Sequence, residues 1–230
     1  MTKIFCDIAD IELIKKFNKK KIVKGFTTNP SLMRKAGAKN YESYSKRIIN
    51  VTNKPISFEV FADNKVQMIK QGIKISKWSN VVYVKIPVLN SKGIFMGEVI
   101  QNLNKKNIKL NVTAVYSSKQ VKKILKKINK KTKVIISIFA GRMADAGIDP
   151  LPEFKKSLKL SKSFKNVKIL WASTREAYNY TQAKQLKCDI ITIPPKIIEQ
   201  IEKFGKSQKY LTLDTVRGFL HDSQKSKFSI

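Results

Sequence analysis

Short apolar runs alternate with longer amphipathic runs along the whole chain of 230 residues, and this alternation constrains the fold most strongly. Short runs rich in Val, Ile and Phe are typical of buried strands, whereas apolar residues spaced three and four apart are typical of helices that pack on a sheet. A repeated order of strand and helix predicts parallel strands joined by helical crossovers. The strand candidates span residues 3–8, 22–28, 55–61, 81–88, 108–116, 134–140, 167–172 and 190–193.

About eight such units in a chain of this length favour a (β/α)₈ TIM barrel with an extra C-terminal helix. The rival fold is a doubly wound open sheet, which usually carries a glycine-rich phosphate loop after its first strand. Here residues 7–10 follow the first strand and contain no glycine. No linker or break in composition is visible, so we expect one domain over residues 1–230. The helix candidates span residues 11–19, 31–36, 41–51, 64–78, 91–104, 118–128, 151–160, 175–186, 195–204 and 213–223.

The charge of the chain is strongly positive, with 47 Lys and Arg against 16 Asp and Glu and a formal net charge of +31. Such a balance is compatible with binding to nucleic acid or to another anionic surface. The lysines recur in nearly every helical segment, however, and they are not gathered beside exposed aromatic residues. We therefore interpret them mainly as solvated helix faces and expect no specific nucleic-acid partner.

Several other classes of protein are disfavoured by what the chain lacks. No stretch approaches the roughly 18 apolar residues of a membrane span, and the N-terminus has no signal-peptide pattern, so we expect a cytoplasmic protein with no membrane partner. Cys6 and Cys188 are too few for a disulfide framework or a zinc site, and we expect buried free thiols. His221, which we expect to be structural or exposed, is the only histidine, so a Ser/His/Asp triad and a histidine metal cluster are excluded.

Lys85 differs from the other lysines because it lies within the apolar run of residues 81–87. Burial disfavours the charged form of a lysine, and a neutral amine can attack a carbonyl to form a Schiff base. We expect this lysine to work uncharged. The alternative is a lysine at the end of a strand whose ammonium group reaches water.

Polar residues punctuate the apolar runs where the strands end, which is the edge at which TIM barrels carry their active sites. Each has a simple structural explanation, such as a helix cap for Asp7, a turn for residues 28–30 or a charge at the strand edge for Glu59. Together these residues suggest a single active site. A lysine near carboxylates supports carbonyl chemistry, and two arginines with a serine at a helix start support a phosphate pocket. The residues concerned are Asp7, Thr28, Asn29, Glu59, Lys85, Asn111, Thr113, Ser137, Arg142, Ser173 and Arg175.

Four segments resemble a known family. Residues 25–32, Gly-Phe-Thr-Thr-Asn-Pro-Ser-Leu, resemble the transaldolase signature around the second strand. Residues 111–113, 137–142 and 172–175 resemble that family's motifs on strands five, six and seven. The resemblance covers nearly the whole chain in order, and the length is similar to the small-subunit branch, which includes the fructose 6-phosphate aldolases. It implies a barrel of the class I aldolase type, with neither metal nor cofactor.

The resemblance also implies a role for each matching residue. Lys85 matches the Schiff-base lysine, and Asp7 matches the acid/base that takes the proton from the C4 hydroxyl as the C3–C4 bond breaks. Glu59 and Thr113 match the pair that holds a catalytic water. Substrate contacts are implied for the remaining matches: Asn29, Asn111 and Ser137 for the dihydroxyacetone portion, and Arg142, Ser173 and Arg175 for the phosphate, with Thr28 and Phe139 beside them.

Two positions bear on the reaction within this family. The fructose 6-phosphate aldolase branch typically has glutamine where Glu59 stands and tyrosine where Phe139 stands. A tyrosine hydroxyl can help to release free dihydroxyacetone and a phenylalanine cannot, so the resemblance favours transfer to an acceptor aldehyde. Ile138 and Thr174 depart from the usual pattern, which leaves the acceptor open.

The resulting prediction is a transaldolase that moves a dihydroxyacetone unit between phosphorylated sugars. The alternatives are an aldolase that releases free dihydroxyacetone, a related aldolase for another sugar, and a basic binding protein on a barrel that has lost catalysis. Members of this family often form rings in which the C-terminal helix reaches a neighbour. We therefore expect a homo-oligomer, and residues 211–219 are apolar enough to dock within or between chains.

Overall fold

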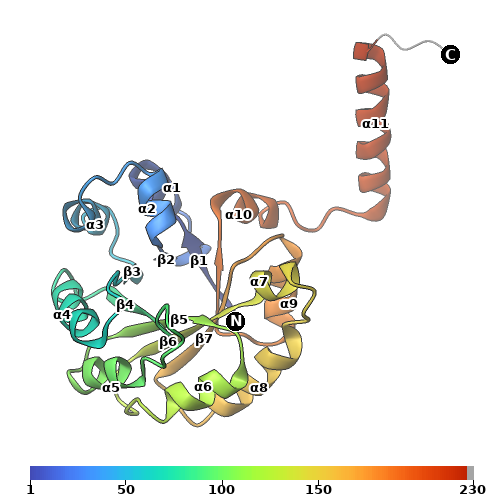
Figure 1. Ribbon diagram of the computed structural model, residues 1–230. Helices are drawn as coiled ribbons and strands as arrows, with labels where there is room; N and C mark the ends of the chain where they lie inside the picture. Colours follow the sequence, from blue (N-terminus) through green and yellow to red (C-terminus); the bar gives the residue numbers. More distant parts are fainter. Residues whose placement is uncertain (227–230) are drawn as a thin grey trace.

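Eight parallel strands form a closed barrel in the order of the chain in this computed structural model, which describes residues 1–226 (Figure 1). The predicted TIM barrel is confirmed, and each strand lies within a range predicted for it. Most strands are one to three residues shorter than those ranges. Their bounds are β1 Lys3–Asp7, β2 Val23–Thr27, β3 Ile56–Glu59, β4 Val82–Pro87, β5 Leu110–Val115, β6 Val134–Phe139, β7 Val167–Ala172 and β8 Ile190–Ile193.

Helices cover the outside of the barrel between successive strands (Figure 1). Asparagine, aspartate or serine side chains cap several of them, as at Asp10, Asn40, Asn64 and Ser117. The helices are α1 Ile11–Asn18, α2 Pro30–Lys35, α3 Tyr41–Ile49, α4 Lys65–Ser76, α5 Gly97–Lys105, α6 Ser118–Leu125, α7 Ala140–Asp145, α8 Leu151–Ser161, α9 Tyr178–Gln185, α10 Pro195–Ile201 and α11 Gln208–Ser226.

Four helix predictions need correction. The short helix α7, directly after β6, was not predicted. The helix expected from residue 91 starts only at Gly97, because Leu89 and Phe95 form a β-bridge that holds the preceding segment as a loop. The helix expected from Arg175 begins at Tyr178, so Arg175 does not lie in its first turn. The final helix is longer than predicted and spans Gln208–Ser226.

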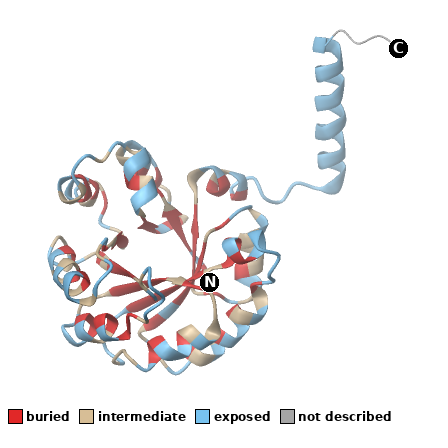
Figure 2. Ribbon diagram, in the orientation of Figure 1, coloured by how far each residue is buried: buried red, intermediate tan, exposed pale blue. Residues whose placement is uncertain are grey.

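The apolar core consists of two separate clusters, and Figure 2 shows the buried strands surrounded by helices with exposed outer faces. The larger cluster fills the space between the sheet and the helices. The smaller one lies inside the barrel and contains Phe5, Ile135, Leu170 and Ile190, with Tyr83 packed against it. Gly25 makes room for it, since a Cβ there would lie 2.6 Å from the ring of Phe5.

Alternation along the strands divides the interior of the barrel into layers, because every second residue of a strand faces the same side. On β1 the apolar ring of Phe5 separates Lys3, which lines a cavity at the amino end, from Asp7, which lines a cavity at the carboxyl end. Along β6, Ile135 lies in the same way between Ser137 and Lys133, which immediately precedes the strand. An apolar layer therefore separates two polar mouths of one barrel.

Helix α11 stands away from the barrel, and every residue in it is exposed (Figures 1 and 2). Its large apolar side chains, among them Leu213, Val216 and Phe219, are each more than 40% exposed. Docking of this helix within its own chain is thus not observed. His221 is exposed on the same helix. Within residues 1–226, no helix has both the length and the apolar character needed to cross a membrane.

Candidate active site

A cavity of about 660 Å³ opens at the carboxyl ends of the strands. Of the twelve predicted site residues, eleven line it although they come from separate parts of the sequence. The barrel brings them together because parallel strands end at the same edge. They are Asp7, Asn29, Glu59, Lys85, Asn111, Thr113, Ser137, Phe139, Arg142, Ser173 and Arg175.

Lys85 is 7% exposed, and its ammonium group is held between two partners. Its Nζ lies 3.1 Å from Glu59 Oε2 and donates to the carbonyl oxygen of Thr28 at 3.1 Å. The register of β3 and β4 pairs Glu59 with Lys85, which places both side chains at the same height in the barrel. The apolar strand around Lys85 had suggested an isolated buried cation. The structure shows instead that a carboxylate compensates the charge of Lys85.

Thr28 is the one predicted substrate-binding residue whose side chain does not reach the cavity. It is fully buried, and its hydroxyl donates to the backbone oxygen of Ser57 at 2.8 Å. The motif that contains it still matters, because the Thr28 carbonyl accepts a hydrogen bond from Lys85. The backbone of Thr28 therefore orients the lysine, and a contact of its side chain with substrate stays a prediction.

Asp7 lies at the carboxyl end of β1, where Thr27 donates to its Oδ1 at 2.6 Å. Burial is the main cause that raises the pKa of Asp7; the Glu59 charge also raises it, whereas the Thr27 hydrogen bond and the Lys85 charge lower it. The Thr27 hydroxyl is also 2.5 Å from that of Thr192. Because Thr27 gives its proton to Asp7, Thr192 donates to Thr27 in this chain of hydroxyl groups.

A row of hydrogen-bonded side chains links β6, β5 and β3. Ser137 donates to Asn111 Oδ1 at 2.7 Å, and the amide nitrogen of Asn111 donates to the hydroxyl of Ser57 at 3.0 Å. The Thr113 hydroxyl is buried and has no hydrogen-bond partner among the described residues. Ala114, beside it, has a φ of 57° where the pairing of β5 with β6 shifts register. This bulge locates a strained residue at the cavity, as is common near active sites.

Two arginines line the rim beside β6 and β7. Arg175 pairs with Asp145 of α7, with Nε to carboxylate distances of 3.0 and 3.1 Å, and the hydrogen bonds from Arg175 lower the pKa of Asp145. The Arg142 guanidinium lies 5.8 Å from the ring centre of Phe139, and it forms no ion pair within the described part of the chain. A cation thus remains available for an anion at this rim.

Gly141 allows the two motifs that carry these arginines to approach each other. A Cβ at this position would lie 1.7 Å from the backbone oxygen of Ser173, so no other residue fits without a backbone shift. Ser173 has a φ of 63°, in the left-handed region. The close contact brings the start of α7 against the end of β7 and sets the spacing of the rim.

Several contributing residues were not predicted as site residues. Tyr41 accepts a hydrogen bond from the backbone nitrogen of Glu59 at 2.9 Å, which fixes the end of β3. Its position between helix and sheet gives no sequence signal. Thr27 and Tyr116 line the cavity, and Asp145 lies on the unpredicted helix α7. Alternation along β2 would have found Thr27, whereas Tyr116 reaches the cavity only because the bulge at Ala114 shifts the alternation after Thr113.

Asn29 acts first as a helix cap, since its side chain accepts from the backbone nitrogen of Leu32 at 2.9 Å at the start of α2. It also lines the cavity. Over residues 1–226, no three His, Cys, Asp or Glu side chains come together in an arrangement that could hold a metal ion.

Comparison with known proteins identifies the family. The sequence profile described as Transaldolase/Fructose-6-phosphate aldolase matches residues 4–230. This chain belongs to that family. The chain is 33% identical over 201 residues to a probable transaldolase of Dehalococcoides mccartyi, covering 86% of this chain and 89% of that protein. It is 30% identical over 227 residues to a probable transaldolase of Nitrosopumilus maritimus, covering 98% and 96%.

Proposed function

We propose that this member of the transaldolase/fructose-6-phosphate aldolase family is a transaldolase that carries a dihydroxyacetone unit on Lys85. The observation that carries the proposal is the placement of Lys85, Glu59 and Asp7 at one cavity, with Lys85 Nζ 3.1 Å from Glu59. A lysine paired with one carboxylate, with a second carboxylate at the same cavity, can be both a nucleophile and a partner in proton transfer. The probable transaldolases to which the chain is similar support the same activity.

The first half of the reaction forms the covalent intermediate. Glu59 takes a proton from the Lys85 ammonium, and the free amine attacks the carbonyl carbon of a ketose phosphate to give a carbinolamine, which loses water to form the Schiff base. The unpartnered hydroxyl of Thr113 supports its role with Glu59 in holding the water that relays these protons. Asp7 then takes the proton of the C4 hydroxyl, the C3–C4 bond breaks, and an aldose phosphate leaves.

The second half runs in reverse on a different aldehyde. The three-carbon enamine that remains on Lys85 attacks the carbonyl carbon of an acceptor aldose phosphate, and Asp7 returns its proton to the new hydroxyl. Water then hydrolyses the Schiff base and frees the lysine. This order predicts ping-pong kinetics.

Substrate binding uses the two sides of the cavity. The row of Asn111 and Ser137 offers amide and hydroxyl groups for the dihydroxyacetone hydroxyls. Arg142, Ser173 and Arg175 form the rim that we assign to the phosphate. Binding energy from this remote phosphate would orient the reacting carbons above Lys85.

Borohydride trapping tests the covalent step. The protein is incubated with fructose 6-phosphate and borohydride, and its peptides are mapped by mass spectrometry. We expect the reduced adduct on Lys85 and no adduct in Lys85→Ala. Absence of any adduct, or an adduct on another lysine that persists in Lys85→Ala, would contradict the proposal.

An aldolase that releases free dihydroxyacetone is a second candidate, and one observation favours it. Tyr116 lines the cavity, and its ring packs 5.8 Å from that of Phe139, so a phenol is present although Phe139 has none. A coupled assay without acceptor aldehyde separates the two candidates. Steady release of dihydroxyacetone that Tyr116→Phe abolishes would establish the aldolase.

We also propose a homo-oligomer in the cytoplasm. The exposed apolar face of α11 supports a contact between copies, because such a surface is costly in water. Cys6 and Cys188 are buried free thiols, which suits a reducing compartment. Sedimentation of the full-length protein should give a multiple of the chain mass, reduced in Leu213→Asp/Phe219→Asp. A monomer at micromolar concentration would contradict it.

A further inference from the structure

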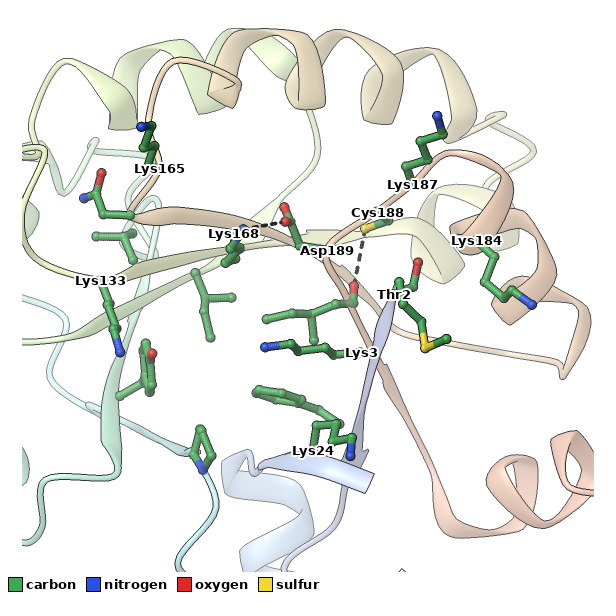
Figure 3. A pocket seen from close by; sticks show the side chains of 18 of the residues that line it. Thr2, Lys3, Lys24, Lys133, Lys165, Lys168, Lys184, Lys187, Cys188 and Asp189 are labelled. Atoms are coloured by element: carbon green, nitrogen blue, oxygen red, sulfur yellow. Dashed lines mark hydrogen bonds and ion pairs between the residues drawn. The ribbon is translucent and has the colours of Figure 1, made fainter. Parts of the chain in front are cut away.

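A second cavity, of about 930 Å³, opens at the amino ends of the strands (Figure 3). Nine lysines line it, against one acidic residue, Asp189. The active-site cavity has four cations and two acids among its lining residues. The positive charge of the chain is thus gathered at this mouth to a degree that a uniform coating of helix faces would not give.

Several of these lysines converge because strand alternation turns them inward. Lys3 shares the inner face of β1 with Phe5, and Lys168 shares that of β7 with Leu170. Lys133, immediately before β6, follows the same alternation with Ile135. In Figure 3 the side chain of Lys3 extends across the opening, and Lys133 enters it from another strand. All nine lysines are exposed, so a ligand can reach their side chains.

The charges at this mouth are almost uncompensated. Asp189 is already engaged, since it pairs with Lys168 at 2.9 Å and accepts from the backbone nitrogen of Ile169 at 3.0 Å. The other eight lysines form no ion pair with any described residue. The field reaches neighbouring side chains: burial lowers the pKa of Lys109, and the charge of Lys133 lowers it further. A concave wall of low dielectric strengthens such a field.

The floor of this cavity is apolar and closes it from the active site. Phe5, Ile135 and Ile190 line the cavity and belong to the cluster inside the barrel. The ring of Phe5 lies so close to Gly25 that even a methyl group would not fit between them. A ligand bound here therefore meets the lysines and this floor, and it does not meet Lys85 or Asp7.

We propose that the amino-end cavity binds a small molecule that carries two or more phosphate groups. Lysine ammonium groups bind phosphate as point charges, and several of them around one pit match several phosphates on one compact ligand. A nucleic-acid strand fits less well, because it needs an open groove and exposed aromatic rings for its bases. The aromatic residues lining this cavity are Phe5, which is 4% exposed, and the half-buried Tyr83.

Calorimetric titration of the full-length protein with sodium tripolyphosphate, in about 150 mM salt to screen weak surface contacts, tests the proposal. We expect one saturable site per chain, and much weaker binding of orthophosphate. Lys3→Gln/Lys133→Gln/Lys168→Gln should weaken tripolyphosphate binding at least about tenfold. The matched control Lys105→Gln/Lys122→Gln/Lys159→Gln removes the same charge from exposed helix positions outside both cavities and should change it less than about twofold.

Three outcomes would overturn the proposal: no saturable site, equal weakening in the two triple variants, or a short single-stranded RNA that binds more tightly than tripolyphosphate and competes with it. Circular dichroism melts check that the variants fold. If the first triple variant does not fold, Lys133→Glu alone must weaken binding, and unchanged binding there would equally refute the site.

Discussion

The two mouths of the barrel both carry cations but use them differently. At the carboxyl end, Lys85 is paired with Glu59, and Arg175 with Asp145. At the amino end, Lys168 alone of nine lysines has an acidic partner in the described structure. Paired charges lie beside groups that can exchange protons, whereas unpaired like charges can only attract an anion. Chemistry is therefore expected at the first mouth and binding without chemistry at the second.

The largest expected effect comes from replacing one lysine at each mouth with methionine and comparing the two transfer rates. Lys85→Met should reduce transfer from fructose 6-phosphate to erythrose 4-phosphate by about 10⁴-fold or more, the scale of losing a covalent nucleophile. Lys133→Met should stay within about twofold of the parent, because Lys133 is exposed and does not line the active-site cavity, and such surface changes usually leave the fold intact. Steady-state rates measure both. Equal losses in the two variants would remove the distinction between the mouths.

Glu59→Gln tests whether the paired acid takes part in the reaction. The amide cannot accept a proton from the lysine or through a bound water, so kcat should fall by about 10²- to 10⁴-fold. The matched control is Glu98→Gln, which breaks the exposed pair of Glu98 with Lys65 and should leave kcat unchanged. Full activity of Glu59→Gln would show that another base removes the protons.

Asp7→Asn should lower kcat by about 10²- to 10⁴-fold and also change the pH dependence of stability. Burial raises the pKa of Asp7, so the folded protein holds this proton more tightly than the unfolded chain does. The ionised carboxylate therefore costs stability, increasingly as pH rises from the unfolded pKa through the folded pKa.

The asparagine variant should consequently be the more stable protein at pH 7, and its advantage should vanish below about pH 4, near the pKa of an unfolded aspartate. Urea denaturation at a series of pH values measures the free energy of unfolding. If the asparagine variant is less stable than the parent at pH 7, the ionised carboxylate of Asp7 does not destabilise the folded protein.

The smallest effect concerns Thr27, which positions Asp7 without being a predicted reactant. Its hydrogen bond lowers the pKa of Asp7, so Thr27→Val should raise that pKa. If Asp7 acts as the base, the acid limb of the kcat/KM profile then moves to higher pH, while the rate above that limb changes little. Thr27→Ser keeps the hydroxyl and should restore the parental profile. A profile unmoved in Thr27→Val would argue against Asp7 as the base.

Much of the fold was predictable because strands and helices differ in the spacing of apolar residues. All eight strands were found, and eleven of the twelve site residues predicted from the strand ends line the cavity. The differences between prediction and structure have local causes. Helix α7 starts directly at the end of β6, so no loop residues separate the two elements in the sequence. Thr28 is polar and adjacent to Asn29, but its hydroxyl turns to the backbone of Ser57.

The sequence by itself determined the barrel, the family and the identity of Lys85 as the unusual lysine, because each depends on local order and spacing. The tertiary structure alone decided which charges meet. It pairs Glu59 with Lys85 and places the Tyr41 hydroxyl at the backbone nitrogen of Glu59. It also brings lysines from distant segments together at the amino-end cavity. Pairings of this kind depend on strand register and barrel closure, which join residues far apart in the chain and leave no mark in any single segment.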